Sequence, residues 1–384
     1  MDLRIEGGRV LAGGRLEAVS VDVAGAAIAA LDSGAGAART LDAAGALVLP
    51  GIVDVHGDAF ERQIMPRPGV SFPLAMALVD SDRQAVANGI TTVFHGVTWS
   101  WEPGLRDGDN ARRILEAIEA LRTQFGADTR FHLRHETFNL DAEAQILDWL
   151  GAGRIDALAF NDHLTTTLKS KNRAGKLAPM MARSGLSETE FMAVVEAKAA
   201  RAGEVPAAVA RLAAKAVAAG VPLLSHDDTS PQERQWFRAL GCRVAEFPVT
   251  EATAKAAAAA GDDIVLGAPN VVRGGSHVGF VKASDMIARG LCTVLASDYY
   301  YPAPLAAAFR LIADGVAAIE TAWPLVSETP ARAAGLADRG VIAAGRRADL
   351  LVVEAADGAA PRLTAVVARG RLVYLRDVAT LRGV

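Results

Sequence analysis

Between residues 51 and 335, short β-rich runs alternate with Ala-, Leu- and Arg-rich helical stretches. Eight such runs end in polar residues, and they read GIVDVHGD, ITTVFHG, RFHLRHE, IDALAFNDH, VPLLSHDD, CRVAEFP, DIVLGAPN and CTVLASD. This alternation predicts an α/β fold, a parallel (β/α)8 barrel of the TIM type. Reactive side chains in such barrels lie where the strands end. The polar ends of the runs are therefore the candidate site.

Both ends of the chain have a different pattern from its centre. Residues 1–50 and 336–384 consist of short β-like runs with glycine turns, such as LRIEGGRVL and LTAVVARGRLVYLRD. Neither end alone has enough strands for a stable sheet. We therefore expect one small β-sandwich domain built from 1–50 and 336–384, with the barrel occupying 51–335.

One βα unit is longer than the others, because an insertion over 164–220 follows the fourth run. Long βα insertions often cap or line an active site. Four basic residues near its start either face an anionic substrate or form a solvated loop, and they are Lys169, Lys171, Arg173 and Lys176.

Composition excludes several classes of protein. In 384 residues, 51% are hydrophobic and 22% charged, which supplies a large core and excludes a disordered chain. The net charge of −4 gives no footprint for nucleic-acid binding. Cys242 and Cys292 are too few for a disulfide scaffold, and we expect both to be buried and inert. Without a signal peptide or an apolar run of about 18 residues, we expect a cytoplasmic protein with no membrane span.

Imidazole and carboxylate groups recur at the ends of five of the runs. Buried charges are costly unless they are paired, so their convergence at a barrel mouth predicts a site for divalent metal. Zinc is the first candidate, and Mn²⁺ or Fe²⁺ would accept the same donors. The predicted ligands are His56, Asp58, Glu136, His163, His226 and Asp298.

The ligand set suggests a hydrolytic reaction. Two cations, bridged by Glu136, would generate a metal-bound hydroxide near neutral pH. Asp298 could hold one metal and also act as the general base. His163 is either a ligand or a substrate contact. The absence of a G-x-S-x-G elbow, a Walker A loop and a dinucleotide fingerprint argues against other mechanisms.

Longer motifs resemble a known superfamily. LVLPGIVDVHGD resembles the first-strand motif of the amidohydrolase superfamily, and GLADRGVIAAGRRADLLVV resembles its return into the small β-domain. GDAFERQIMPRPGV, LRHE, SHDDTSPQER, GAPNVVRGGSHVG and LASDYYYPAPLAAAF are similar to its phosphonate-utilisation branch, the α-D-ribose 1-methylphosphonate 5-triphosphate diphosphatases. This resemblance implies release of pyrophosphate from a ribose 5-triphosphate that carries a 1-phosphonate.

The resemblance also implies roles for single residues. His56 and Asp58 match the first-strand metal pair, with Asp replacing a His that is common elsewhere in the superfamily. Glu136, His226 and Asp298 match the bridging, fifth-strand and eighth-strand positions.

Substrate contacts are predicted from the same motifs. His277 is either a substrate contact or a loop histidine that caps a turn. Arg67, Arg134 and Arg273 are candidate phosphate clamps, because a guanidinium offers a bidentate fork, although each could equally be a structural ion pair.

Two segments depart from the family pattern. NDHLTTTLKSKN replaces a run of the Pro-Gly-Gln-Arg-Gln type, and TWSWEPGLRDGDN follows the second strand. In the second segment, Trp99 and Trp101 either stack on a substrate ring or pack internally. Both segments would border the substrate, so the sequence leaves the exact substrate open.

Two other functions remain open at this stage. The same hydroxide could cleave a C–N bond in a cyclic amide or an N-acyl compound. A catalytically dead barrel acting as a binding subunit is disfavoured, because the acidic and imidazole positions are intact. For the hydrolase we expect a small anionic substrate, no nucleic-acid or membrane partner, and a homodimer as one oligomeric option.

Overall fold

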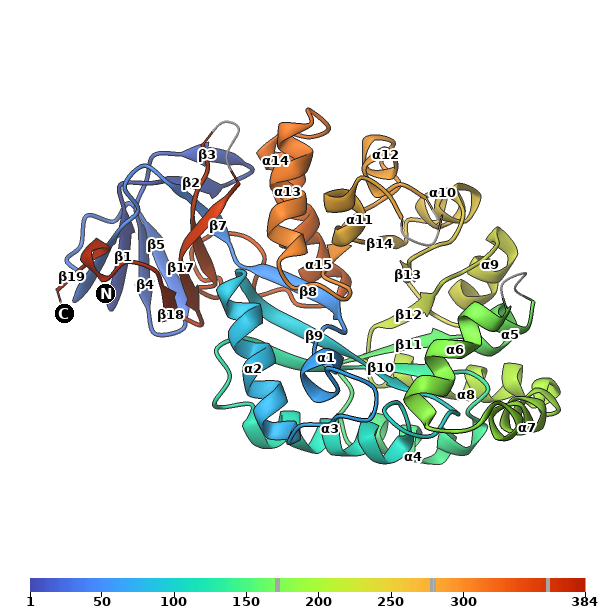
Figure 1. Ribbon diagram of the computed structural model, residues 1–384. Helices are drawn as coiled ribbons and strands as arrows, with labels where there is room; N and C mark the ends of the chain where they lie inside the picture. Colours follow the sequence, from blue (N-terminus) through green and yellow to red (C-terminus); the bar gives the residue numbers. More distant parts are fainter. Residues whose placement is uncertain (170–172, 277–278, 280, 357–359, 384) are drawn as a thin grey trace.

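The computed structural model describes residues 1–169, 173–276, 279, 281–356 and 360–383. Its central feature is an eight-stranded sheet in which each strand pairs in parallel with the next along the chain. This confirms the predicted (β/α)8 barrel, shown in Figure 1. The strands are β8 (Ile52–Gly57), β9 (Ile90–Trp99), β10 (Asp128–Glu136), β11 (Ala157–Asn161), β12 (Leu223–His226), β13 (Val244–Glu246), β14 (Asp263–Gly267) and β15 (Val294–Ala296).

The first and last strands meet through a short bridge that closes the barrel. Gly57 forms an isolated parallel bridge with Asp298, and the amide of Asp58 donates to the Asp298 carbonyl at 2.9 Å. Below this bridge, the buried Asp54 carboxylate accepts hydrogen bonds from the amide (2.9 Å) and the hydroxyl (2.5 Å) of Ser297. These bonds hold Asp58 and Asp298 next to each other at the rim.

Small aliphatic side chains and one phenylalanine fill the barrel interior. Because side chains alternate along a strand, every second residue points inward. The interior cluster comprises Val53, Val55, Phe94, Ala157, Ala159, Leu224, Val244, Val265, Val294 and Ala296. The next inward positions, toward the carboxyl ends, carry the polar residues of the candidate site.

Amphipathic helices cover the outside of the barrel. In the helix Gly108–Leu121, for example, Ala111, Ile114, Leu115 and Ile118 are buried at helical spacing, and the Asp107 side chain caps its first turn. The helices of this layer are α1 (Glu61–Ile64), α2 (Leu74–Ala87), α3 (Gly108–Leu121), η1 (Leu140–Ala142), α4 (Glu143–Gly151), α8 (Val205–Ala218), α9 (Pro231–Ala239), α10 (Glu251–Ala259), α11 (Ala268–Arg273), α12 (Ala283–Ala288), α13 (Ala303–Ala313), α14 (Ile319–Ala322), η3 (Trp323–Val326) and α15 (Glu328–Ala333).

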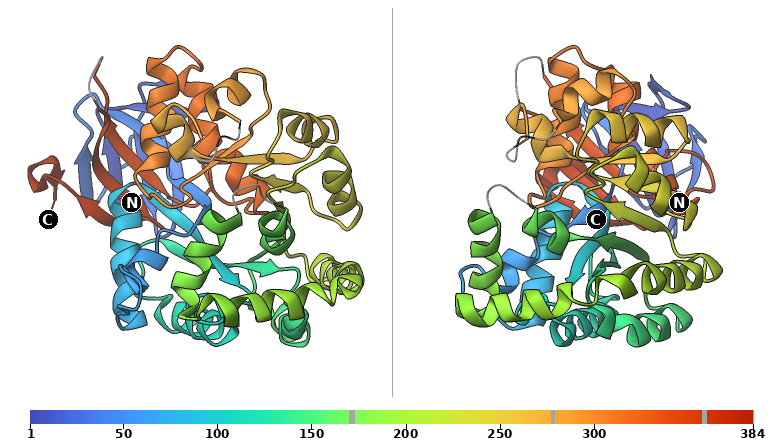
Figure 2. Two further views of the ribbon diagram at one scale, coloured as in Figure 1. Left: turned by 45° about the vertical axis from the view of Figure 1, so that its right-hand side comes forward. Right: turned by 90° about the vertical axis from the view of Figure 1, so that its right-hand side faces the viewer.

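Two smaller sheets combine strands from both ends of the chain, as expected. They lie beside the barrel, where both termini are found (Figure 1), and the left view of Figure 2 shows the same arrangement. The first sheet has the order β19-β6-β1-β4-β5 and the second β18-β17-β16-β7-β2-β3. A shared apolar core from both sheets makes them a β-sandwich. The strands are β1 (Leu3–Glu6), β2 (Arg9–Ala12), β3 (Arg15–Glu17), β4 (Val21–Ala24), β5 (Ala27–Leu31), β6 (Arg39–Asp42), β7 (Leu47–Pro50), β16 (Leu350–Glu354), β17 (Arg362–Ala368), β18 (Arg371–Leu375) and β19 (Leu381–Arg382), with η4 (Val378–Thr380) between the last two.

The segment after β11 forms α5 (His163–Leu168), α6 (Arg173–Ser184), α7 (Glu188–Ala199), η2 (Ala202–Glu204) and then α8. Helix α8 packs on the barrel as the crossover helix to β12, so the additional structure in this unit consists of α5–α7. These helices have a small core of their own, which includes Leu164, Leu177 and Phe191.

Both cysteines are buried and free, as expected, and burial raises the pKa of each thiol to about 12. Among the described residues, none of the helices combines the length and apolar character needed to cross a bilayer.

Candidate metal centre

The structure brings together five of the six predicted ligands at the carboxyl ends of the barrel strands. Two groups have ligand atoms that all lie within 4.8 Å of one another: His56, Asp58 and Asp298 form one, and His163, His226 and Asp227 form the other. A single cation could reach every member of either group.

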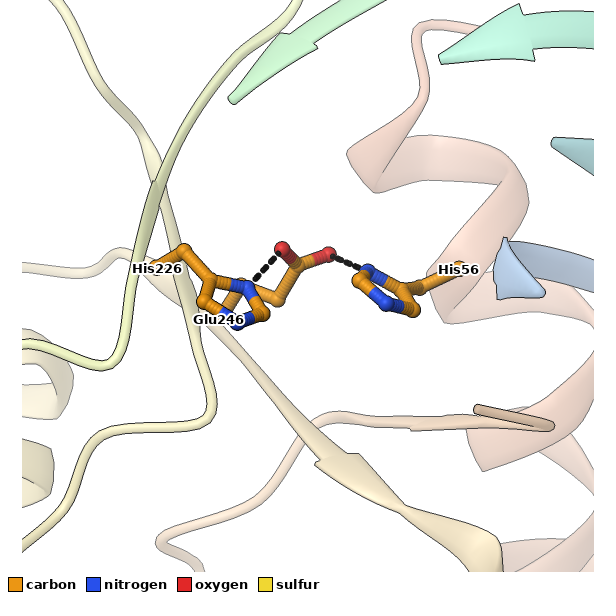
Figure 3. Close-up of side chains that lie close together, drawn as sticks. All are labelled: His56, His226 and Glu246. Atoms are coloured by element: carbon orange, nitrogen blue, oxygen red, sulfur yellow. Dashed lines mark hydrogen bonds and ion pairs between the residues drawn. The ribbon is translucent and has the colours of Figure 1, made fainter. Parts of the chain in front are cut away.

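A buried carboxylate fixes the orientation of one histidine from each group. Glu246, at the end of β13, accepts a hydrogen bond from His56 Nδ1 (2.7 Å) and another from His226 Nδ1 (2.7 Å). In Figure 3 its carboxylate lies between the two rings. The net effect of its surroundings is a pKa of Glu246 well below the usual value. Burial alone would raise this pKa, but the charge of His56 and the hydrogen bonds from His226 and His56 together outweigh burial. The ionised carboxylate keeps the Nδ1 protons in place, so the Nε2 atoms carry the lone pairs that a metal would use. His226 Nε2 accepts from Arg134 in this structure, and a metal bound there would displace that hydrogen bond.

A second carboxylate, that of Glu136, fixes the orientation of the His163 ring. Glu136 Oε1 lies 2.5 Å from His163 Nδ1, and Glu136 Oε2 accepts from the His163 amide at 3.2 Å. Burial raises the pKa of Glu136, but the charge of His163, its two hydrogen bonds and the charge of Arg134 together outweigh burial and lower the pKa to about 2. Glu136 thus contacts a candidate ligand through both oxygens and belongs to neither metal-sized group of described residues. Its predicted role as a bridging ligand stays a prediction.

Two carboxylates face each other across the barrel seam. Burial, followed by the charge of Asp58, raises the pKa of Asp298 to about 7. Such a pair is electrostatically costly, and a divalent cation between the two would offset that cost.

Arg134 reaches both groups from the inner face of β10. Its Nη1 lies 3.4 Å from Asp58 Oδ2, and its Nη2 donates to His226 Nε2 at 3.2 Å. The absence of a side chain at Gly96 on β9 leaves room for this guanidinium, because a Cβ there would lie 3.1 Å from Arg134 Cδ and 3.6 Å from His56 Nε2. Arg134 is the predicted phosphate clamp that lies closest to the candidate ligands.

Three residues just past strand ends adopt left-handed backbone angles, which are uncommon for residues other than glycine. The φ angles are 59° at Asp227, 54° at Phe247 and 55° at Asp298. Each amide still donates to the neighbouring strand, to the carbonyls of Glu246, Val265 and His56 respectively. Outliers of this kind cluster at functional sites. At Asp227 and Asp298 the turn carries a carboxylate to the barrel mouth.

The donor set fits a divalent metal. Three histidines present Nε2 atoms whose Nδ1 partners are carboxylates, the arrangement that orients metal-binding imidazoles in proteins. Carboxylates supply the remaining donors in both groups. Glu246 also forms a metal-sized group with His56 and His226, but its oxygens already accept from their Nδ1 atoms. We therefore assign it to orientation.

A cavity of about 350 Å³ opens over both groups, since His226 and Asp227 of the second group also line it. Its lining includes His56, Asp298 and three cationic side chains, Arg134, Lys176 and Arg273. Arg273 ends α11, and its Nη1 lies 3.4 Å from the Tyr299 hydroxyl.

The other predicted substrate contacts are not part of this lining. Arg67 is exposed and pairs with Val70 in an isolated bridge, so its predicted role stays a prediction. His277 lies outside the described residues, as does Lys171, and nothing is described of the Arg173 side chain. Lys169 is exposed.

Sequence reasoning missed two residues of the centre, Glu246 and Asp227. The signal for Glu246 is positional: it ends the sixth strand where the other strands carry their ligands. Asp227 lies next to the predicted ligand His226, and strand alternation alone would turn it away from the mouth. Its left-handed turn reverses that direction.

Comparison with known proteins agrees with the fold. No family model matches the chain. The chain is 32% identical over 328 residues to the α-D-ribose 1-methylphosphonate 5-triphosphate diphosphatase of Escherichia coli (strain K12), covering 83% of this chain and 86% of that protein.

Two solved structures share the fold. A D-hydantoinase from Bacillus sp. AR9 has a TM-score of 0.66 at 13% identity, covering 97% of this chain and 95% of that one. An amidohydrolase has a TM-score of 0.64 at 15% identity, covering 98% and 99%. The chain shares its fold with these amidohydrolases, and it belongs to the family of α-D-ribose 1-methylphosphonate 5-triphosphate diphosphatases, which are hydrolases.

Proposed function

We propose that the protein releases pyrophosphate from a ribose 5-triphosphate carrying a 1-phosphonate and leaves a 5-phosphate. The observation that carries this proposal is the 32% identity over 328 residues to a relative whose name states that substrate. The cavity over the centre adds independent support, because Arg134, Lys176 and Arg273 line it. A triphosphate carries about four negative charges near neutral pH, and cationic side chains of this kind bind phosphate oxygens.

We further propose that two divalent cations bind, with zinc as the first candidate. His56, Asp58 and Asp298 would hold one, and His163, His226 and Asp227 the other. Divalent cations acidify water and offset the charge of phosphoryl oxygens.

The protein's own residues would carry out the remaining steps. Asp298 would accept the proton of the attacking water at its carboxylate. Arg134 and Arg273 would bind phosphate oxygens and orient the triphosphate. Water would add to phosphorus as the phosphoanhydride bond to pyrophosphate breaks, so that the leaving group carries away the charge of that bond.

A C–N hydrolase remains the competing function. The likeness to a D-hydantoinase concerns the fold alone, at 13% identity, and fold does not determine reaction.

A panel of substrates, assayed with metal-loaded protein, distinguishes pyrophosphate release from C–N bond hydrolysis. We would assay pyrophosphate release from ribose 1-methylphosphonate 5-triphosphate and, in parallel, ring opening of hydantoins and hydrolysis of N-acyl amino acids. The proposal requires pyrophosphate release at least about 100-fold above that of Asp298→Asn. Asp314→Asn, a change at an exposed helix end, is the matched control and should behave as wild type. Turnover of the amides without pyrophosphate release would replace the proposal with the alternative.

A further inference from the structure

A second cavity, of about 320 Å³, lies beside Glu136 and His163 and beneath the inserted helices α5 and α6. Lys176 lines both this cavity and the one over the metal groups, so the two are adjacent. Hydroxyl groups of Thr98, Ser100 and Thr167 line the second cavity beside the carboxylate of Glu102, together with the cationic side chains of Arg106, Lys176 and Arg183.

Glu102 has one oxygen occupied and one without a partner. Its side chain is 2% exposed. Oε1 accepts hydrogen bonds from Arg183 Nε (3.1 Å) and Nη2 (2.9 Å), whereas Oε2 is buried with no hydrogen-bond partner among the described residues. Buried acceptors without partners are rare, because each forfeits its hydration. A ligand donor in this cavity would satisfy it.

Thr98 shows the same feature on the inner face of β9, opposite Arg134 in the strand register. It is 3% exposed, and its Oγ1 also has no partner among the described residues. Two residues that line this cavity therefore each have a buried oxygen without a partner, which is compatible with a ligand that carries hydroxyl groups.

The loop that carries Glu102 is fixed in place by backbone contacts. Asn139 Nδ2 donates to the Ser100 carbonyl (3.0 Å), the Ser100 amide donates to the Arg106 carbonyl (2.7 Å), and the Glu102 amide donates to Ser100 Oγ (3.2 Å). The rings of Trp99 and Trp101 pack internally, against Trp149 and Phe191. The wall is therefore organised before a ligand arrives, which lowers the entropic cost of binding.

We propose that this cavity is the sugar subsite, in which Glu102 accepts a hydrogen bond from a ribose hydroxyl and Arg183 positions Glu102. The inference rests on the proposed function. Both cavities are lined by three cationic side chains, but Arg106 and Arg183 of the second cavity are each held by a carboxylate, Glu61 and Glu102 respectively. The remaining Glu102 oxygen repels phosphate and prefers a neutral hydroxyl donor, so we assign the sugar to this cavity and the phosphates to the adjacent one.

The test compares wild type with Glu102→Leu on two probes, the 5-triphosphates of ribose and of 2,3-dideoxyribose. We expect wild type to favour the ribose compound by about 10- to 100-fold in kcat/KM, and the variant to reduce that ratio to about one. Glu119→Leu, which removes the acid of a surface pair with Arg154, is the matched control and should keep the full ratio. A full ratio in Glu102→Leu, or no preference in wild type, would overturn the proposal.

A binding measurement separates this inference from the proposed reaction. Calorimetry with ribose 5-phosphate and 2,3-dideoxyribose 5-phosphate requires no turnover and can be run on wild type alone. Tighter binding of the ribose compound, lost in Glu102→Leu, supports the subsite even if pyrophosphate release is not observed. Equal binding of the two compounds to wild type would overturn it even if the release is observed.

Discussion

Glu246 Oε1 lies 2.7 Å from His56 Nδ1, joining two residues that are 190 positions apart in the chain. The other oxygen of the same carboxylate holds His226. One acid therefore sets the orientation of a candidate ligand in each metal group.

Glu246→Gln should lower metal occupancy and reduce activity by about 10- to 100-fold. An amide offers only one acceptor oxygen, so one of the two histidines loses its carboxylate partner and can move its proton to Nε2, which prevents ligation. Bound metal per chain, measured by elemental analysis, reports the effect directly. Glu251→Gln on the exposed start of α10 serves as control. Unchanged occupancy in Glu246→Gln would refute the orienting role.

Asp298→Asn should reduce kcat by about two to four orders of magnitude while leaving the fold intact. The amide keeps the size of the side chain but cannot accept a proton. Steady-state kinetics, together with circular dichroism, separate loss of chemistry from loss of structure. Substantial residual kcat would remove Asp298 from its predicted role as base.

His95 gives the protein a stability that declines in acid. Burial lowers the pKa of His95 to about 3, and its ring packs on Phe60, outside the metal centre. An unfolded histidine titrates near pH 6.5, so between the two values the unfolded chain binds the extra proton and stability falls as pH falls.

Between pH 7 and pH 5, the titration of His95 in the unfolded chain should lower the free energy of unfolding by on the order of 2 kcal/mol. His95→Leu should remove that share of the pH dependence, which urea unfolding at the two pH values would measure. The same pH dependence in wild type and variant would show that His95 does not remain neutral when folded.

Asp128 links the start of β10 to the segment that returns to the β-sandwich. Its Oδ2 accepts from Arg339 Nη1 (2.6 Å) and Arg347 Nη1 (3.2 Å). Asp128→Asn should lower the free energy of unfolding by about 2–3 kcal/mol, because the buried Arg339 would lose the buried one of its two carboxylate partners and keep only the exposed Asp338.

Activity per folded molecule should not change in Asp128→Asn, since Asp128 lies at the opposite end of β10 from Glu136. Glu119→Gln, which removes the acid of an exposed ion pair with Arg154, should lower the free energy of unfolding by less than about 1 kcal/mol. Equal costs for the two variants would contradict a special role for the Asp128 cluster.

The barrel and most of its centre could be predicted from sequence because strand ends of a barrel meet at one rim. His56, Asp58, His226 and Asp298 each end a β-rich run, so topology alone brings them together. Glu246 was missed because the residues directly beside it in the sequence include no histidine or other carboxylate. Its partners, His56 and His226, come from other strands. Asp227 was missed because its direction depends on one backbone dihedral angle, which composition and alternation do not encode.

Roles are harder to predict than positions. The sequence assigned Glu136 to a bridge between metals, whereas the structure directs both of its oxygens to His163. The difference lies in a few ångströms of side-chain placement among residues that the structure brings together.

Anomalous diffraction from crystals grown with zinc tests the central claim most directly. We predict one peak among His56, Asp58 and Asp298 and a second among His163, His226 and Asp227, with Glu246 and Glu136 behind the histidines. Peaks elsewhere, or none at these two positions, would contradict the account.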